Sequence, residues 1–92
     1  MLFNTRDILS VAQAHHFAVP AFNIGAGAFL NAVLECCEEV RSPLILQGFP
    51  AEMEFQGEHF VAGCLAAAHR ASIPVAVHLD HGLKFSQILW AI

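Results

Sequence analysis

Three short apolar runs, separated by helical patterns, most constrain what this chain can fold into. They begin near residues 18, 44 and 75, at the spacing of about 30 residues that is typical of β-α-β units. The runs lack regular alternation of apolar and polar residues, which favours parallel strands covered on both faces. Strands and helices that alternate in this way form either a doubly wound α/β sheet or a (β/α)8 (TIM) barrel. A barrel needs eight strands and about 250 residues, so residues 1–92 would be its first three β/α units, a truncated and incomplete domain.

Short stretches of turn and cap residues divide the chain into the expected elements. The strands are predicted at residues 18–24, 44–47 and 73–79. Helices are predicted at residues 6–16 after an Asn-Thr cap, at residues 28–40, across residues 60–68, and from about residue 84 onward. The stretch "GFPAEMEFQG", which follows the second strand, is expected to be a loop.

Three of these helices carry apolar stripes: those at residues 28–40, at residues 60–68 and from residue 84 onward. In the helix at residues 28–40, Glu35, Glu38 and Glu39 fall opposite the stripe and are expected to form a solvated face. The last helix is expected to bury a stripe of its own. The apolar positions are Phe29, Leu30, Val33, Leu34, Cys37 and Val40 in the first, and Phe85, Ile88, Leu89 and Ile92 in the last.

Composition excludes several classes of function. The net charge of −4 and only four Lys and Arg residues give no basic footprint for nucleic acid. Residues 8–34 carry no charge but include two histidines, two asparagines and a proline, which argues against a membrane span. No signal peptide is visible. Three cysteines without a C-x-x-C spacing indicate reduced thiols and a cytoplasmic protein.

Apolar residues make up 57% of the chain and charged residues 13%, against about 45–50% and 25% in a typical domain. A small domain should be more polar than a large one, because more of it is surface. The excess therefore indicates part of a larger core or an oligomer.

Polar side chains stand at or just beyond the carboxyl ends of all three predicted strands. Asn23 ends the first strand, Gln47 ends the second, and "HLDHG" ends the third. In α/β folds the active site lies at this edge. Alternation along the third strand puts His78 and Asp80 on the same face. The sequence therefore predicts an active-site mouth here.

The group His78, Asp80 and His81 suits two chemistries. An imidazole of His81, which begins the loop, could bind Zn²⁺, and Asp80 could act as a general base beside a metal-bound substrate. Gly82 is expected to let the backbone turn. The alternative is a buried carboxylate that accepts hydrogen bonds from neighbouring histidines and amides, and spacing alone leaves both open.

The motifs "AVPAFNI", "NAVLECCEEVRSPLIL" and "PVAVHLDHG", in this order along the chain, resemble the opening of the class II, zinc-dependent ketose-bisphosphate aldolases. The resemblance covers essentially the whole chain. It implies a (β/α)8 barrel that reversibly cleaves a fructose or tagatose 1,6-bisphosphate to dihydroxyacetone phosphate and glyceraldehyde 3-phosphate. It also implies a homo-oligomer at full length.

The resemblance assigns roles to four residues. Asp80 matches the catalytic acid/base that exchanges a proton with the C4 hydroxyl of the sugar. His81 matches the first zinc ligand, and the zinc polarises the substrate carbonyl. Asn23 matches an asparagine that contacts the triose-phosphate portion, and His78 is given an orienting role.

Two features depart from the family pattern. Phe49 stands where family members often carry Ser or Thr. The other zinc ligands and the glycine-rich phosphate-binding loops are expected beyond Ile92, and one imidazole does not hold a catalytic zinc, which takes about three protein ligands. The chain alone is therefore expected to be inactive.

Two other readings stay open. The chain could be a non-catalytic fragment or a subunit that acts only with a partner supplying a Glu and two more His. It could also be a binding module with a three-stranded sheet, although unpaired strand edges and the apolar excess argue against that.

Overall fold

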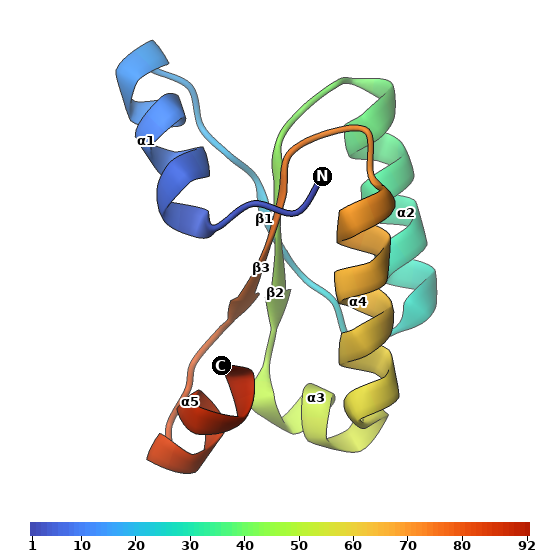
Figure 1. Cartoon of the computed structure of the whole chain (residues 1–92). Helices are drawn as coiled ribbons and strands as arrows, with labels where there is room; N and C mark the ends of the chain where they lie inside the picture. Colours follow the sequence, from blue (N-terminus) through green and yellow to red (C-terminus); the bar gives the residue numbers. More distant parts are fainter.

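The computed structural model describes residues 1–92 as a parallel three-stranded sheet with helices on both faces and at one end (Figure 1). The strand order is β1-β2-β3, so each strand pairs with the next one along the chain. The strands are β1 (Ala21–Asn23), β2 (Leu44–Gly48) and β3 (Val75–Leu79). The helices are α1 (Thr5–His15), α2 (Gly27–Glu39), α3 (Pro50–Gln56), α4 (Glu58–Arg70) and α5 (Phe85–Ala91).

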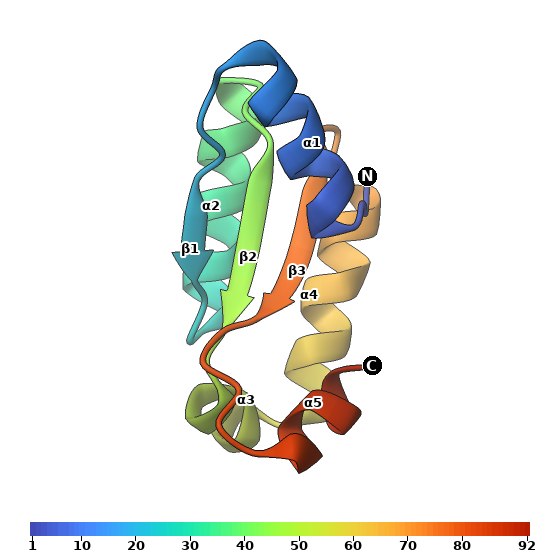
Figure 2. The same cartoon turned by 90° about the vertical axis from the view of Figure 1, so that its left-hand side faces the viewer.

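Helices α2 and α4 cover one face of the sheet, and α1 covers part of the other (Figure 2). The covered face presents Leu44, Leu46 and Val75, all fully buried, against the two helices. Because side chains alternate along a strand, the adjacent residues point to the opposite face. These are Ile45 of β2 and Ala76 of β3. There they form a smaller buried cluster with Ile8 of α1.

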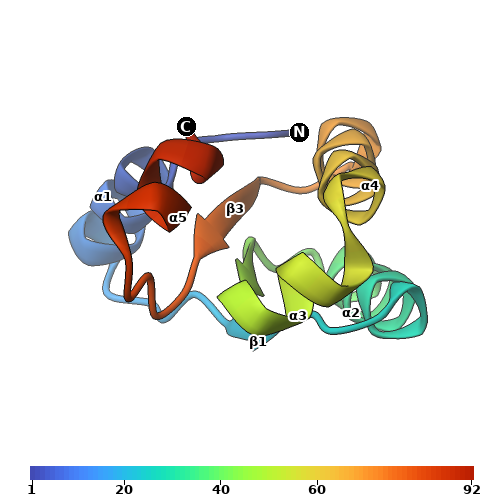
Figure 3. The same cartoon turned by 90° about the horizontal axis from the view of Figure 1, so that it is seen from below.

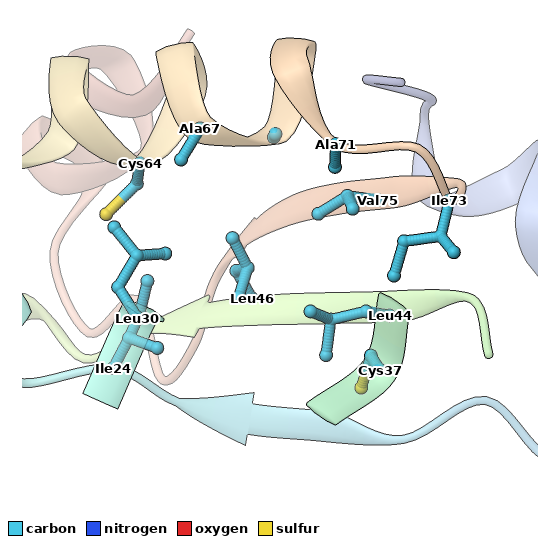
Figure 4. Close-up of a cluster of buried hydrophobic side chains, with 11 residues drawn as sticks. Ile24, Leu30, Cys37, Leu44, Leu46, Cys64, Ala67, Ala71, Ile73 and Val75 are labelled. Atoms are coloured by element: carbon cyan, nitrogen blue, oxygen red, sulfur yellow. The ribbon is translucent and has the colours of Figure 1, made fainter. Parts of the chain in front are cut away.

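The main core lies between the sheet and helices α2 and α4 (Figure 4). Small side chains at the helix contact, such as Ala68, and the thiols of Cys37 and Cys64 let the helices approach the strands closely. All three cysteines are free, as expected, and only Cys36 is exposed. Burial raises the pKa of the Cys37 and Cys64 thiols above the usual value, so both stay protonated in the core.

Helix α1 begins where its sequence predicts. The side chain of Asn4 accepts a 2.8 Å hydrogen bond from the backbone N–H of Asp7, which satisfies one of the free donors of the first turn. The segment before the cap also joins the sheet, because Phe3 donates a backbone hydrogen bond of 2.8 Å to Val75. The chain thus crosses from the edge of β3 to the face that α1 covers.

The predicted elements are confirmed with four corrections. The stretch expected to be a loop contains α3, which starts at Pro50 and buries Met53. Strand β1 is only three residues long and exposed, and β2 is its single partner strand. Helix α5 forms but buries no residue. At the ends of the α2 stripe, Phe29 and Val40 are exposed.

Glu38 corrects the expectation of a purely solvated acidic face on α2. Its carboxylate accepts hydrogen bonds from the backbone N–H and the hydroxyl of Ser72, at 2.6 and 3.0 Å. The hydrogen bond from the Ser72 backbone is the main cause that holds the pKa of Glu38 below its usual value. Glu38 thus ties the end of α2 to the turn before β3.

No helix in the structure combines the length and the apolar content that a membrane crossing needs.

Candidate active site

A row of polar side chains crosses the sheet at the carboxyl ends of the strands. Asn23 pairs in register with Gln47, and Gln47 pairs with His78. Residues paired in a parallel sheet point to the same face, and this row continues the face that carries Ile45 and Ala76 one step earlier. The sheet therefore stacks a polar layer directly above the apolar layer that α1 covers.

Asp80 follows this row by one alternation step, just beyond β3. Its backbone N–H donates a 3.0 Å hydrogen bond to the carbonyl of Gly48, so the pairing of β2 with β3 continues to this residue. The Asp80 side chain is 19% exposed. A carboxylate held on a strand end and still open to solvent can exchange a proton with a bound molecule.

His81 sits beside Asp80 but on a very different backbone. Its φ of 53° lies in the left-handed region, which histidine tolerates better than most residues. This conformation turns the chain out of the strand and leaves the His81 side chain 68% exposed. Its Nε2 atom lies 3.6 Å from an Asp80 carboxylate oxygen, beyond the usual length of a direct hydrogen bond.

The expected role of Gly82, to let the backbone turn without a Cβ clash, agrees with the space around it, although the positive φ lies one residue earlier. The residue with positive φ is His81, whereas Gly82 is not among the positive-φ glycines. A Cβ atom at Gly82 would lie 3.2 Å from Cδ2 of Leu79. Gly82 thus allows the loop to pass close to the end of β3.

Helices α3 and α5 stand beyond the carboxyl ends of the strands and flank the polar residues (Figures 2 and 3). A cavity of 320 Å³ lies between these helices, lined by Met53, Leu79, Glu54 and Trp90 among others. None of Asn23, His78, Asp80 and His81 lines it. The cavity is therefore beside the predicted site and not part of it.

Helix α3, which the sequence analysis missed, supports the loop that follows Asn23. The side-chain amide of Gln56 donates a 2.5 Å hydrogen bond to the carbonyl of Gly25. A Cβ atom at Gly25 would lie 3.0 Å from a carboxylate oxygen of Glu52. The signal that could have revealed this helix is Pro50, since proline is common at the first helical position.

No three His, Cys, Asp or Glu side chains come close enough together to hold a metal ion. Asp80 and His81 form a pair, and His78 stands in the neighbouring row of the sheet. The donor chemistry of His81 suits zinc, and its exposed ring is accessible. These residues could supply one ligand of a zinc ion but not a complete zinc site.

Comparison with known proteins gives a consistent result. The sequence matches the family described as fructose-bisphosphate aldolase class-II over residues 3–92. A fructose-bisphosphate aldolase from Thermus caldophilus is 39% identical over 92 residues, which are 100% of this chain and 30% of that protein. The chain thus spans about a third of the length of such relatives.

Solved structures agree in fold. The crystal structure of the YdjI aldolase from Escherichia coli K12 superimposes with a TM-score of 0.92 at 29% sequence identity. The match covers 99% of this chain and 36% of that one. A structure from Coccidioides immitis matches 87% of this chain and 30% of its own, with a TM-score of 0.83 and 29% identity.

Proposed function

The chain belongs to the class II fructose-bisphosphate aldolase family, and we propose that it forms the first three β/α units of a (β/α)8 barrel that cleaves a ketose 1,6-bisphosphate. The observation that carries this proposal is the placement of Asp80 and His81 at the end of β3, next to the row of Asn23, Gln47 and His78. In a barrel the catalytic residues stand at the carboxyl ends of several strands.

Asp80 is proposed as the general acid/base. In cleavage, its carboxylate takes the proton of the C4 hydroxyl, and the C4–O bond becomes a carbonyl as the C3–C4 bond breaks. The bonding electron pair passes to C3 and is delocalised toward the C2 carbonyl. In the reverse direction Asp80 returns the proton. The backbone hydrogen bond to Gly48 supports this role, because it holds the Asp80 backbone at the rim of the sheet.

His81 is proposed as one ligand of a zinc ion. When bound, zinc would supply a Lewis acid that polarises the substrate carbonyl. About three protein ligands are usual at a catalytic zinc, and His81 offers a single accessible imidazole. The other ligands would come from outside these 92 residues.

Asn23 and His78 are proposed as binding and orienting residues. Both residues are exposed and lie on the sheet face that carries Ile45 and Ala76. The register of the strands puts Gln47 between them. Asn23 would donate its amide hydrogens to oxygen atoms of the triose-phosphate portion. His78, two residues before Asp80 on the same face, would fix the position of the substrate or of the Asp80 carboxylate.

A second reading, a subunit that needs a partner, is supported by the exposed apolar surface of α5. If no single polypeptide contains both these residues and the missing ligands, the chain acts as a subunit that needs a partner. The exposed apolar residues of α5, among them Leu89 and Trp90, suit a surface that another polypeptide or a further part of the barrel covers. On either reading these 92 residues alone are expected to be inactive.

A chimeric enzyme tests the proposal. This chain would replace the matching 92 residues of the Thermus caldophilus aldolase, to which it is 39% identical. We expect the purified chimera to cleave fructose or tagatose 1,6-bisphosphate and to retain zinc. The His81→Ala variant should lose zinc, measured by elemental analysis, whereas Glu39→Gln on the exposed face of α2 should keep it. A folded chimera in which His81→Ala binds zinc as tightly as the parent would contradict the proposal.

A further inference from the structure

Phe49 and His81 lie in direct contact, although they come from different β/α units. The centroids of their rings are 5.9 Å apart, and the ring planes meet at 74° in an edge-to-face arrangement. This is the preferred geometry for a pair of aromatic rings, which adds attraction beyond simple burial. It is the only aromatic pair of this kind in the chain.

The contact stands next to a backbone link between the same two segments. Gly48 accepts the hydrogen bond of Asp80, and the next residue on each side, Phe49 and His81, makes the ring contact. The end of β2 therefore contacts two successive residues beyond β3. Gly48 binds the backbone of Asp80, and Phe49 contacts the side chain of His81.

Little else restrains the His81 ring. The side chain is 68% exposed, and its nearest polar partner, the Asp80 carboxylate, is 3.6 Å away. By contrast, Phe49 is half-buried and is the N-cap residue of α3, where its backbone carbonyl accepts a 3.0 Å hydrogen bond from Met53. The phenyl ring thus stands on a hydrogen-bonded backbone, and the exposed imidazole ring packs against it.

We propose that Phe49 is a positioning residue for His81, which selects the orientation of the imidazole through an edge-to-face contact. The contact between the two rings is observed in the structure, whereas its effect on zinc binding rests on the proposed function of His81 as a zinc ligand. Phe49 has no hydrogen-bonding side-chain atom, so it orients the imidazole ring by shape and quadrupole and occupies neither imidazole nitrogen with a hydrogen bond.

The test uses NMR of the 92-residue chain. In the parent, the carbon-bound ring protons of His81 should be displaced from the values of an unstructured peptide by the ring current of Phe49. The Phe49→Leu variant keeps an apolar side chain without the ring and should lose most of that displacement. Phe49→Tyr keeps the aromatic ring and should restore it. Core methyl resonances serve as the measure of correct folding in each variant.

A parent chain with no displacement at His81 would overturn the proposal. So would a folded Phe49→Leu variant in which the His81 ring protons keep their parent values. A loss of the displacement in Phe49→Tyr as well as in Phe49→Leu would also contradict it, because a purely aromatic contact should survive the added hydroxyl.

The zinc consequence is measured separately in the chimera described above. Loss of a group that orients a metal ligand typically weakens metal affinity by 10-fold or more, so Phe49→Leu should bind zinc about 10-fold more weakly than the parent or Phe49→Tyr. Altered His81 resonances with unchanged zinc affinity would support the positioning of His81 and contradict its consequence for zinc, whereas unchanged zinc binding in His81→Ala would contradict the ligand assignment. The two proposals therefore fail by different results.

Discussion

The backbone N–H of Asp80 donates a 3.0 Å hydrogen bond to the carbonyl of Gly48, one residue beyond the last paired position of β3. This bond extends the β2–β3 ladder up to the proposed acid/base. Directly after it, the backbone turns into the left-handed region at His81. The end of β2 therefore determines where the strand stops and where the site loop starts.

Substitution of Gly48 by alanine should destabilise the fold. The new Cβ would lie 3.0 Å from both Cγ and Sδ of Met53, a buried side chain that would have to shift toward the cavity it lines. Overpacking of this kind costs about 1–3 kcal/mol. The control is Gly27→Ala at the start of α2, where a Cβ meets nothing within 4 Å. There the smaller entropy of the unfolded chain should raise stability by about 0.4–1 kcal/mol. Urea unfolding followed by circular dichroism measures both, and equal stabilities would refute the argument.

Truncation of Leu46 should be severe. The side chain is completely buried between the sheet and its helices, and Leu→Ala at such positions costs about 2–5 kcal/mol. A small domain has about 5–15 kcal/mol in total, so Leu46→Ala should lose a large share of its stability and unfold at a clearly lower urea concentration. Phe55→Ala is the matched control, because that larger side chain is 88% exposed and its loss should change stability by less than about 0.5 kcal/mol. Similar unfolding midpoints for the two variants would contradict the described core.

The contact between Glu38 and Ser72 predicts a specific dependence of stability on pH. Hydrogen bonds from Ser72 lower the folded-state pKa of Glu38 below the usual 4.5, so the folded state binds fewer protons than the unfolded state. The stabilisation is complete above the unfolded value and is lost as the pH falls through the folded-state pKa. Melting curves should show Glu38→Gln less stable than the parent at pH 7, with the gap narrowing below pH 4.5. A gap between the parent and Glu38→Gln that is independent of pH would count against the contact.

The three thiols should react at clearly different rates. Cys36 is exposed, whereas Cys37 and Cys64 are buried, and burial raises the pKa of both buried thiols. Because the thiolate is the reactive form, a thiol reagent under native conditions should label one cysteine quickly and two only slowly. In Cys36→Ser the fast phase should disappear. Three equal rates in the parent would show that the core opens faster than the reagent reacts.

The sequence predicted the strands and long helices correctly because their signals are local. Apolar runs near residues 18, 44 and 75 mark the strands, and the cap at Asn4 marks the first helix. Helix α3 was missed because glycine and proline around "GFPAEMEFQG" are typical of loops, while its buried anchor is the single residue Met53. The burial of β1 was overestimated because exposure at a sheet edge depends on the neighbouring strands, which local patterns do not describe.

The residues of the candidate site could be named from the sequence because polar residue types at the strand ends are also a local signal. The residue types at the strand ends identified Asn23, His78, Asp80 and His81, whose catalytic and binding roles remain predictions. Contacts between residues far apart in the sequence could not be predicted from local patterns. Gln56 hydrogen-bonds a carbonyl 31 residues away in the sequence, and Glu38 accepts hydrogen bonds from Ser72, which is 34 residues away. The left-handed backbone at His81 also left no mark in the sequence, where the following glycine was the expected turn residue.

The rate of sugar-bisphosphate cleavage by Asp80→Asn in the chimeric aldolase tests the central claim most directly. Asparagine keeps the size of the side chain but cannot accept the C4 hydroxyl proton, and loss of a general acid/base costs about 10²–10⁴-fold in rate. We predict a fall of that size in kcat with zinc content unchanged and with the Glu39→Gln control unaffected. A folded, zinc-loaded Asp80→Asn chimera that cleaves the substrate at the rate of the parent would contradict the account.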